Sequence, residues 1–420
     1  MSPSSPPPAR RTWDRLRELA EITAPGDGVS RDGYSAYERL AQDLVGAWMR
    51  DAGLSVTRDH AGNLRGRVAG RDPLLPAVWV GSHLDSVPGG GRFDGAYGVV
   101  GGLAAVEAAT GGETPLRSIE LVAFACEEGA RFGTGLLGSR GLVEGWADVD
   151  VDALVDRDGV SLRAALASVG LDAEAVRAPS LTPGSVHCFV ELHVEQGPVL
   201  DTAAATIGVV SAIAAPTYLR VRFEGAAGHA GTTPMVGRRD ALVGAAEAIL
   251  EVERAARSYD GAAVSTVGFL AVHPNSANVI PGSVTFSVDV RALDADTKRR
   301  LVEEIAAGLQ RTAQARSLQL SVATLADLAP VACHPPIQGA VRDAATSLGL
   351  PWLDMPSGAY HDAMAMSRVC PVGMVFVPSA RGLSHVAEEW TSPDDLEHGV
   401  DVLAEVLRTL ASTTGIEGAG

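Results

Sequence analysis

The stretch GSHLDSVPGGGRFDG, residues 81–95, follows the apolar run 76–80 and precedes a segment rich in alanine, valine and glycine that is typical of a helix. A strand, a glycine-rich loop and a helix in this order form the setting in which backbone amides bind phosphates. Gly89 and Gly91 fit the first two glycines of a dinucleotide-binding fingerprint, but the third position is Asp94. A carboxylate there would repel a pyrophosphate, so the loop is predicted to serve a positively charged group instead of a nucleotide.

Length and composition indicate a globular protein of two domains that acts on a small molecule. The chain has 420 residues, of which 46% are hydrophobic and 20% are charged, and its net charge is −17. This length exceeds one ordinary hydrophobic core. The negative charge argues against nucleic acid or an anionic membrane as a partner, because both require a basic surface.

The four cysteines and the first residues favour a cytoplasmic protein. Cys126, Cys188, Cys333 and Cys370 lie far apart, without the spacing of a zinc knuckle or a disulfide framework. The opening MSPSSPPPARR has serine and proline where a signal peptide needs an apolar core, and no run of about 18 apolar residues follows. We therefore expect residues 1 to about 10 to be disordered and no segment to span a membrane.

Strands that alternate with helices predict an α/β sheet with covering helices in the first half of the chain. Two of these strands break directly into polar residues, one at Glu127 and one at His193. Because ligands of such sheets gather beyond the carboxyl ends of the strands, these are candidate site positions. The predicted elements are a helix over 34–49, strands over 54–58, 64–68 and 77–82, a helix over 96–109, and strands over 118–125 and 188–192.

The pattern changes near Ala215 to the order β-α-β-β-α-β, which is the ferredoxin-like order, and returns to α/β after Pro330. About a hundred residues are enough for such a domain to fold alone. We therefore predict a catalytic domain in two segments, 11–214 and 329–420, with a smaller domain inserted over 215–328. The elements expected from Ala215 onward are strands over 218–223, 263–269, 284–291 and 318–323, helices over 238–257 and 295–315, then helices over 337–348, after His361 and over 392–410, and a strand over 372–377.

Imidazoles and carboxylates are expected to converge at the carboxyl edge of the predicted α/β sheet. Together they suit divalent ions such as zinc. Two adjacent glutamates that leave a buried strand point in different directions, so one can coordinate a metal while the other reaches a metal-bound water. Each residue taken singly also has a structural explanation, as a hydrogen-bonded histidine or a solvated loop glutamate. The residues are His83, Asp94, Glu127, Glu128, His193 and His385.

Seven motifs together resemble, in the same order, those of the dinuclear-zinc amidohydrolases of the M20 peptidase superfamily. They are GSHLDS…GGRFDG, CEEGARFGTGLLGSR, ELHVEQGPVL, GHAGTTPM, NSANVIPG, SGAYHDAM and LSHVAEEW, and the likeness runs from about Trp13 to Leu410. The branch most resembled holds N-carbamoyl-L-amino-acid hydrolases, allantoate amidohydrolases and β-ureidopropionase. The resemblance implies a zinc-exopeptidase-like catalytic domain, a mixed sheet with covering helices, and an inserted ferredoxin-like domain that acts as lid and dimerisation domain.

The resemblance also implies two divalent metal ions per subunit. His83 and His193 are similar to the ligands of one metal, Glu128 and His385 to those of the other, and Asp94 to the carboxylate that bridges both. Zinc is expected first, with manganese, cobalt or nickel as alternatives, because these ligand types do not discriminate among them. The peptidase branch usually has an acidic ligand in place of His193, which favours an amidohydrolase over a dipeptidase.

Two further residues resemble catalytic groups of the family. Glu127 resembles the general base, which takes a proton from a metal-bound water and delivers it to the leaving nitrogen. His229 resembles the oxyanion donor that acts across a homodimer, although a loop histidine can instead cap local backbone.

Arg291 resembles the arginine that binds the substrate carboxylate, and its alternative is pairing with Asp289 or Asp294.

Other polar positions resemble substrate contacts or supporting residues. Asn278 and Gln196 are similar to the groups that bind the amino-acid and ureido parts of the substrate, and Gly358 matches a backbone contact. His361 and Asp362 open a helix beside the site in the family, so support of the metal ligands or helix capping is expected in place of metal ligation.

The expected activity is cleavage of the carbamoyl group from an N-carbamoyl L-amino acid or a related ureido acid, which releases ammonia, carbon dioxide and the amine. Tyr360 stands where many relatives have glycine and is expected to narrow the pocket, while Ala130 replaces a serine of the allantoate-like form. The alternatives are an allantoate or ureidoglycolate amidohydrolase, an M20 metallopeptidase or N-acyl amino-acid deacylase, and a binding protein that keeps its metals for structure.

Overall fold

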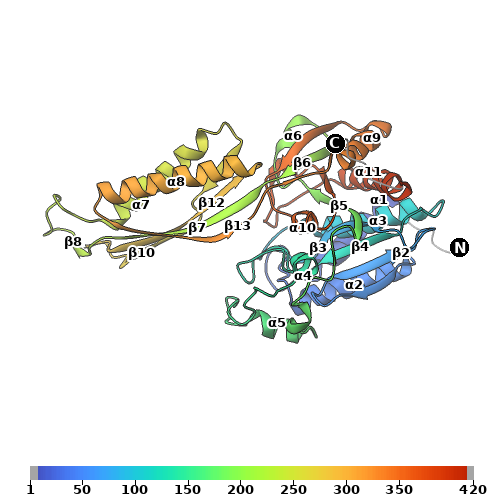
Figure 1. Cartoon of the computed structure of the whole chain (residues 1–420), viewed down its shortest axis with the longest axis horizontal. Helices are drawn as coiled ribbons and strands as arrows, with labels where there is room; N and C mark the ends of the chain where they lie inside the picture. Colours follow the sequence, from blue (N-terminus) through green and yellow to red (C-terminus); the bar gives the residue numbers. More distant parts are fainter. Residues whose placement is uncertain (1–7, 414–420) are drawn as a thin grey trace. The chain divides into compact units, whose positions relative to one another are not determined.

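The computed structural model describes residues 8–413, which form two compact units (Figure 1). Unit 1 comprises the chain up to Ser211, the segment Cys333–Ser357 and the chain from His361 onward; unit 2 comprises Ala212–Ala332 and Gly358–Tyr360. Each unit has its own cluster of buried hydrophobic residues. Within residues 8–413, no helix combines the length and the apolar character needed to cross a membrane.

A nine-stranded mixed sheet forms the centre of unit 1, in the order β1-β2-β4-β3-β5-β16-β6-β14, with β15 paired to β6. Its edge strand β14 and the last two residues of β6, which pair with each other, are counted with unit 2. The strands β4, β3, β5 and β16 are mutually parallel, and every residue of β3, β4 and β16 is buried. Continuous apolar runs suit such central strands, since helices or loops cover both faces. The bounds are β1 Ser55–Arg58, β2 Leu64–Val68, β3 Ala77–His83, β4 Ile119–Phe124, β5 Val186–Val194, β6 Ile207–Ile213, β14 Val331–Ala332, β15 Trp352–Ser357 and β16 Val372–Val377.

The helix α3 is buried between the sheet and other helices, in contact with β3, β5, α1 and α11. Its sequence AYGVVGGLAAVEAAT is apolar on nearly all sides, which suits a buried helix. A Cβ atom on Gly98 would lie 2.3 Å from the carbonyl oxygen of Leu192, so glycine there allows α3 to approach β5 closely. The helices of unit 1 are α1 Pro8–Ala20, α2 Ala36–Asp51, α3 Ala96–Thr110, α4 Leu137–Val143, α5 Leu162–Ser168, α6 Val199–Ala203, α9 Pro335–Ser347, α10 Asp362–Met366 and α11 Pro393–Ser412, with short 3-10 turns at Ala173–Val176 and Ala380–Gly382.

The start of α1 corrects one expectation. The backbone is helical from Pro8, so residues 8–10 belong to this helix and not to a disordered lead. Proline is compatible with a helix start because the first turn has no partner for its backbone amide. Residues 1–7, for which disorder was also predicted, lie outside the described residues.

Unit 2 has the predicted ferredoxin-like order, and the expectation for the fold class is confirmed. Its five-stranded antiparallel sheet runs β10-β12-β7-β13 with β9 paired to β12, and α7 and α8 lie on one face (Figure 1). The alternating burial along β12 matches this one-sided cover. A separate ribbon pairs β8 with β11. The bounds are β7 Ala215–Glu224, β8 Gly228–His229, α7 Ala241–Arg257, β9 Ala263–Thr266, β10 Leu270–His273, β11 Val279–Ile280, β12 Ser283–Ala292, α8 Ala295–Ala315 and β13 Gln319–Asp327.

Two strands of unit 2 differ from their predicted bounds. The strand expected over 263–269 is two strands, β9 and β10, separated by a short irregular segment that contains Gly268. The strand expected over 318–323 continues as β13 to Asp327, past a shift of register between Thr324 and Ala326. Such an irregularity breaks the two-residue periodicity by which a strand is recognised.

Candidate metal centre

The predicted metal-binding side chains lie where the central parallel strands end. Because β4, β3, β5 and β16 run in the same direction, the loops that follow them meet at one edge of the sheet. The structure brings six side chains together there, and all but two of them are buried. They are His83 at the end of β3, Asp94 before α3, Glu127 and Glu128 after β4, His193 near the end of β5, and His385 between β16 and α11.

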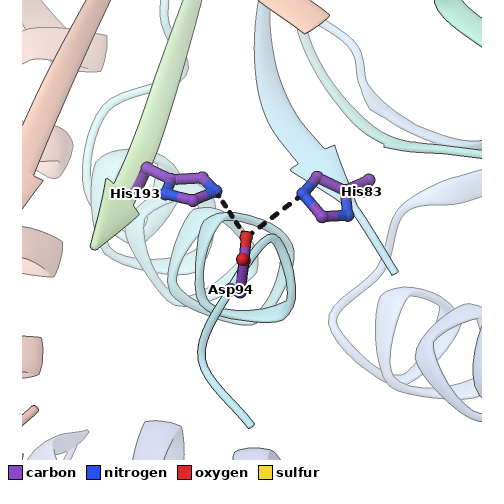
Figure 2. A group of neighbouring side chains, drawn as sticks. All are labelled: His83, Asp94 and His193. Atoms are coloured by element: carbon purple, nitrogen blue, oxygen red, sulfur yellow. Dashed lines mark ion pairs between the residues drawn. The ribbon is translucent and has the colours of Figure 1, made fainter. Parts of the chain in front are cut away.

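Asp94 lies at the centre of this cluster and has histidines on both of its oxygens. Its Oδ1 is 3.5 Å from Nε2 of His83 and 3.2 Å from Nε2 of His193, as Figure 2 shows. Its Oδ2 is 3.2 Å from Nε2 of His385, and the same nitrogen is 3.5 Å from Oε2 of Glu128. One carboxylate therefore joins two groups of donors, which is the arrangement needed to bridge two cations.

Hydrogen bonds fix which ring nitrogen of His83 and of His193 faces Asp94. His83 donates from Nδ1 to the carbonyl oxygen of Asp85 at 3.0 Å, and His193 donates from Nδ1 to that of Val194 at 2.8 Å. In the neutral form of each ring Nε2 has the lone pair, and Nε2 of His193 then accepts the Gly95 amide at 3.2 Å, whereas in the protonated form Nε2 donates to Asp94. Lone pairs that face a carboxylate fit a cation placed between them, so this donor set fits a divalent metal ion.

The electrostatics of the cluster also favour added positive charge. Burial, followed by the charge of Asp94, raises the pKa of Glu128 to about 8. The hydrogen bond to Asp94 raises the pKa of His385 to about 9 against the opposing effect of burial. Burial acts to raise the pKa of Asp94, but its hydrogen bonds to the histidines hold that pKa well below its usual range. Protons or cations must therefore balance these buried carboxylates, and metal binding is expected to release protons.

Glu127 is buried beside the metal-binding candidates and approaches His83. Its Oε2 lies 3.8 Å from Nε2 of His83. Burial, together with the charges of Asp362 and Glu128, raises the pKa of Glu127 well above its ordinary value, although His83 acts in the opposite direction. A carboxylate with a raised pKa can take a proton near neutral pH and release it later.

Three residues of the site that are not glycine have left-handed backbone conformations. Cys126, which precedes the glutamate pair, has φ 53°, Gln196 has φ 61° and His385 has φ 59°. Non-glycine residues adopt this region at a cost of about 1–3 kcal/mol, and such strain concentrates at functional sites. Gln196 also donates from Nε2 to Oδ2 of Asp94 at 2.8 Å, so its amide contacts a metal-binding candidate directly.

Three buried carboxylates that support the site were missed from the sequence. The carboxylate of Asp85 accepts the backbone amides of Glu127 and Glu128 at 2.9 and 3.1 Å, which ties the end of β3 to the turn after β4. The other two are Glu191, on β5, and Glu389, four residues after His385. The sequence contained a signal for Asp85 and Glu191. Each lies two residues from a histidine at the end of an apolar strand, His83 or His193, and acidic residues are unusual in such surroundings.

A third group of possible ligands, Glu191, His193 and His361, lies just behind the cluster. The carboxylate of Glu191 already accepts the Ser82 hydroxyl at 2.7 Å and the Ala363 amide at 3.0 Å. Nε2 of His361 lies 2.8 Å from the Ser357 hydroxyl, and His361 makes no side-chain capping bond to α10. His361 also packs edge to face against His193, with ring centroids 4.7 Å apart. Because Glu191 and His361 are already engaged by these other partners, we interpret them as a support for His193 in place of a third metal site.

Four predicted site residues belong to unit 2, and two of them lie side by side. His229, on β8, pairs with Val279 on β11, directly after Asn278. Nδ1 of His229 accepts the amides of Gly231 and Thr232 at 3.1 Å each, so this exposed imidazole does cap local backbone. The same bonds leave the hydrogen of the neutral ring on Nε2, which makes that atom a donor.

The other two, Arg291 and Gly358, contact each other within unit 2. Arg291 donates from Nη1 to the Gly358 carbonyl at 3.0 Å and from Nη2 to the Tyr218 hydroxyl at 3.3 Å. The pairing considered as an alternative is also present, because Nε and Nη2 of Arg291 bond the Asp289 carboxylate at 3.0–3.2 Å. Asp289 thus occupies one of the two forks of the guanidinium.

The two pairs of unit 2 lie at opposite ends of its long strands. Arg291 pairs with Pro216 at one end of β12, whereas Ser283, near the β8 and β11 ribbon, pairs with Glu224 at the other. Eight residues of strand span about 26 Å. Figure 1 shows β8 at one end of unit 2. His229 and Arg291 of one chain are therefore too far apart to contact the same small molecule.

The fold and this donor set are those of a metal-dependent hydrolase with histidine and carboxylate side chains as candidate ligands. Residues 79–409 match the model of peptidase family M20/M25/M40. The chain belongs to this family, in its hydantoinase/carbamoylase branch of amidohydrolases.

The relatives include enzymes with two different names. An N-carbamoyl-L-amino-acid amidohydrolase of Paenarthrobacter aurescens is 42% identical, over 96% of this chain and 98% of the relative. A ureidoglycolate hydrolase of Arabidopsis thaliana is 38% identical, over 95% of this chain and 86% of the relative. The solved structure of a hydantoinase/carbamoylase family amidase from Burkholderia multivorans is 36% identical with a TM-score of 0.86, over 96% of this chain and 98% of that structure.

Proposed function

We propose that this protein is a dinuclear-metal amidohydrolase that cleaves the carbamoyl C–N bond of an N-carbamoyl L-amino acid or a related ureido acid. The products are ammonia, carbon dioxide and the free amine. The observation that carries the proposal is Asp94, which has imidazole nitrogens on both of its oxygens. The carbamoylases among the relatives, at 40–42% identity, support the substrate class.

Five residues would hold the two cations, with zinc expected first and manganese, cobalt or nickel as alternatives. His83 and His193 form the inner pair, Glu128 and His385 the outer pair, and Asp94 belongs to both. When bound, the cations supply an acidified water and Lewis acidity toward the scissile carbonyl.

The catalytic residues of the chain act on protons and on the developing negative charge. Glu127 takes a proton from the attacking water on its carboxylate and returns it to the leaving nitrogen. His229 donates from Nε2 to the oxyanion of the tetrahedral intermediate. The bonds that Nδ1 of His229 accepts support this role, because they leave the proton on the outward nitrogen.

We infer that His229 and Asn278 serve the site of a second copy in a homodimer, while Arg291 serves its own. The separation of the two groups along β12 supports this division. Unit 2 also exposes large apolar side chains that suit an interface, among them Met235, Val236 and Leu250. We also propose a cytoplasmic location, since all four cysteines are free and buried.

Arg291 and Gly358 would bind the substrate carboxylate, and Gln196 with Asn278 its other polar groups. The Nε and Nη2 fork of Arg291 is held by Asp289, and its terminal nitrogens also donate to Gly358 and Tyr218, so a substrate carboxylate at the fork between Nη1 and Nη2 would replace these two contacts. Tyr360 interacts electrostatically with Arg291. It would therefore lie near the bound carboxylate and restrict the size of the substrate's amino-acid side chain.

The main alternative is an allantoate or ureidoglycolate type of amidohydrolase, which the Arabidopsis ureidoglycolate hydrolase favours at 38% identity. Such substrates are also ureido acids and would use the same metal centre and carboxylate clamp. A metallopeptidase or N-acyl amino-acid deacylase is less well supported, since His193 stands where the peptidases usually have an acid.

A substrate comparison on metal-reconstituted protein tests the proposal. Chelated protein is reloaded separately with zinc, manganese, cobalt or nickel and assayed for ammonia and amine release. The substrates are N-carbamoyl, N-acetyl and dipeptide forms of the same amino acids, with ureidoglycolate and allantoate. We expect turnover to be highest with a carbamoyl amino acid and to be lost without metal. Higher turnover of the acetyl or dipeptide form would refute a carbamoylase.

A further inference from the structure

Glu389 joins two loops that carry metal-binding candidates. Its Oε1 accepts the backbone amides of Phe93 and Asp94 at 3.0 and 3.1 Å. Its Oε2 accepts the hydroxyl of Ser384 at 2.8 Å, and Ser384 is the neighbour of His385. Only 3% of Glu389 is exposed, so one buried carboxylate links the loop of Asp94 to the loop of His385.

The glycine-rich loop leaves space for this carboxylate. A Cβ atom on Gly91 would lie 2.2 Å from Oε1 of Glu389, which is far inside van der Waals contact. The backbone of Gly91 does not have a positive φ, so the position requires glycine for space and not for conformation.

Aromatic rings hold the neighbours of Glu389 in place. Phe93 and Trp390 pack edge to face with ring centroids 6.1 Å apart, and Trp13 of α1 contacts them at 6.0 and 5.3 Å. Phe93 precedes Asp94, and Trp390 follows Glu389. Each of the two loops is thus fixed by packing beside the polar link.

From these contacts we propose that Glu389 is a positioning residue for the outer cation, the one that Asp94, Glu128 and His385 would hold. Two of these three donors lie on the loops that Glu389 joins. The inner pair has its own supports, the carbonyl oxygens after His83 and His193. The inference rests on the proposed two-metal centre, and it predicts that loss of Glu389 weakens one cation selectively.

Metal titration of the chelated full-length protein with Mn²⁺ or Zn²⁺ tests this directly. We expect two cations per wild-type subunit. In Glu389→Ala the affinity for one of the two cations should fall about 10–100-fold, while the affinity for the other changes little. Glu389→Gln should retain both, because its amide oxygen can accept both amides and its NH₂ group can donate to Ser384.

Gly91→Ala gives an independent route to the same outcome, because it displaces Glu389 without altering it. It also answers the question if Glu389→Ala does not fold. The matched control is Glu120→Ala, which removes a buried carboxylate from the opposite end of β4, where it pairs with Arg65 and Arg67. That control should lose stability but bind both cations.

The outcomes separate this inference from the proposed function. If wild-type protein binds two cations and both Glu389→Ala and Gly91→Ala bind them with unchanged affinity, Glu389 does not position the outer cation. If Glu120→Ala loses a cation to the same extent, the effect is general destabilisation and the inference fails. If wild-type protein does not bind two cations, the two-metal proposal itself fails.

Discussion

Glu127 and Glu128 are adjacent in sequence, yet their surroundings assign them different chemistry. Oε2 of Glu128 lies 3.5 Å from Nε2 of His385, within the outer group of donors, whereas Oε2 of Glu127 approaches His83 on the inner side. Asp85 accepts both of their backbone amides, so the backbone that carries the two side chains is held in one orientation. One glutamate can therefore bind a cation while the other remains available to move a proton.

Glu127→Gln keeps the shape of the side chain but removes its capacity to take a proton. We expect kcat to fall about 10²–10⁴-fold while both metals remain bound, because general acid–base catalysis contributes about this factor. Steady-state rates with metal analysis of the same samples measure both quantities. Glu128→Gln is the matched comparison and should lose metal as well as activity. Near-normal turnover of metal-loaded Glu127→Gln would contradict the proposed mechanism.

Arg291→Lys tests the carboxylate clamp, since lysine keeps the charge but cannot form a fork. We expect KM to rise about 10-fold, the loss of about one charge-assisted hydrogen bond, with a smaller change in kcat. The measurement compares an N-carbamoyl amino acid with the corresponding carbamoyl amino-acid amide, which has no carboxylate. The amide should be hydrolysed equally by both proteins, and an equal loss for both substrates would contradict a clamp.

At this scale, the residues that the sequence predicted are those at strand ends. Their types and positions can be read from the local sequence, and the carboxyl ends of parallel strands always meet at the same edge of the sheet. Glu389 and its partner Asp94 are separated by 295 residues, and the bond between them depends on the register of loops that no periodicity encodes. The pairing of Arg291 with Asp289 was visible as a possibility because the two are close in sequence.

At the scale of elements, the buried parallel strands and the amphipathic helices were predictable because each repeats one residue class with a clear period. The strand β6 was missed although IGVVSAI is strongly β-forming, as were β15 and the short helices α4 and α5. The two-residue strands β8 and β11 have too few residues to show a period. They depend on their pairing with each other, which is a tertiary effect.

His187 on β5 provides a test of how burial within a strand affects stability. Burial, with the charge of Arg117 as a second cause, lowers the pKa of this partly buried histidine from 6.5 to about 4. Between these values the unfolded chain binds more protons than the folded one, so stability falls as the pH drops through this window. From about pH 7.5 to about pH 5, the decrease in the free energy of unfolding should therefore be about 1 kcal/mol smaller for His187→Gln than for wild type, after allowance for solvent screening.

Urea unfolding of the metal-free proteins at both pH values measures this difference, and use of metal-free protein removes the effect of metal loss in acid. His398→Gln, on α11, is a suitable control because it replaces another histidine of unit 1. An identical pH dependence in wild type and His187→Gln would show that His187 does not titrate differently in the folded protein.

At the scale of the whole molecule, the charge is distributed unevenly between the two units. Residues 212–332 carry as many acidic as basic side chains, so the net charge of −17 belongs to the rest of the chain. Two copies that meet through unit 2 would therefore avoid most of the repulsion between their acidic units. This distribution favours unit 2, which also carries His229, as the surface through which two copies associate.

Mixed dimers test whether His229 acts in the partner's site. His229→Ala alone should lower kcat about 10²–10³-fold, as loss of an oxyanion donor does. In a dimer of one His229→Ala subunit and one Glu127→Gln subunit, the His229→Ala subunit keeps its own Glu127 and receives His229 of the partner subunit. One of the two sites is then complete, and we expect about half of the wild-type activity per dimer. Mixed dimers isolated with two different affinity tags can be assayed directly, beside each parent dimer as a control. Activity no higher than that of the parents would mean that His229 serves its own chain, in conflict with its separation from Arg291 along β12.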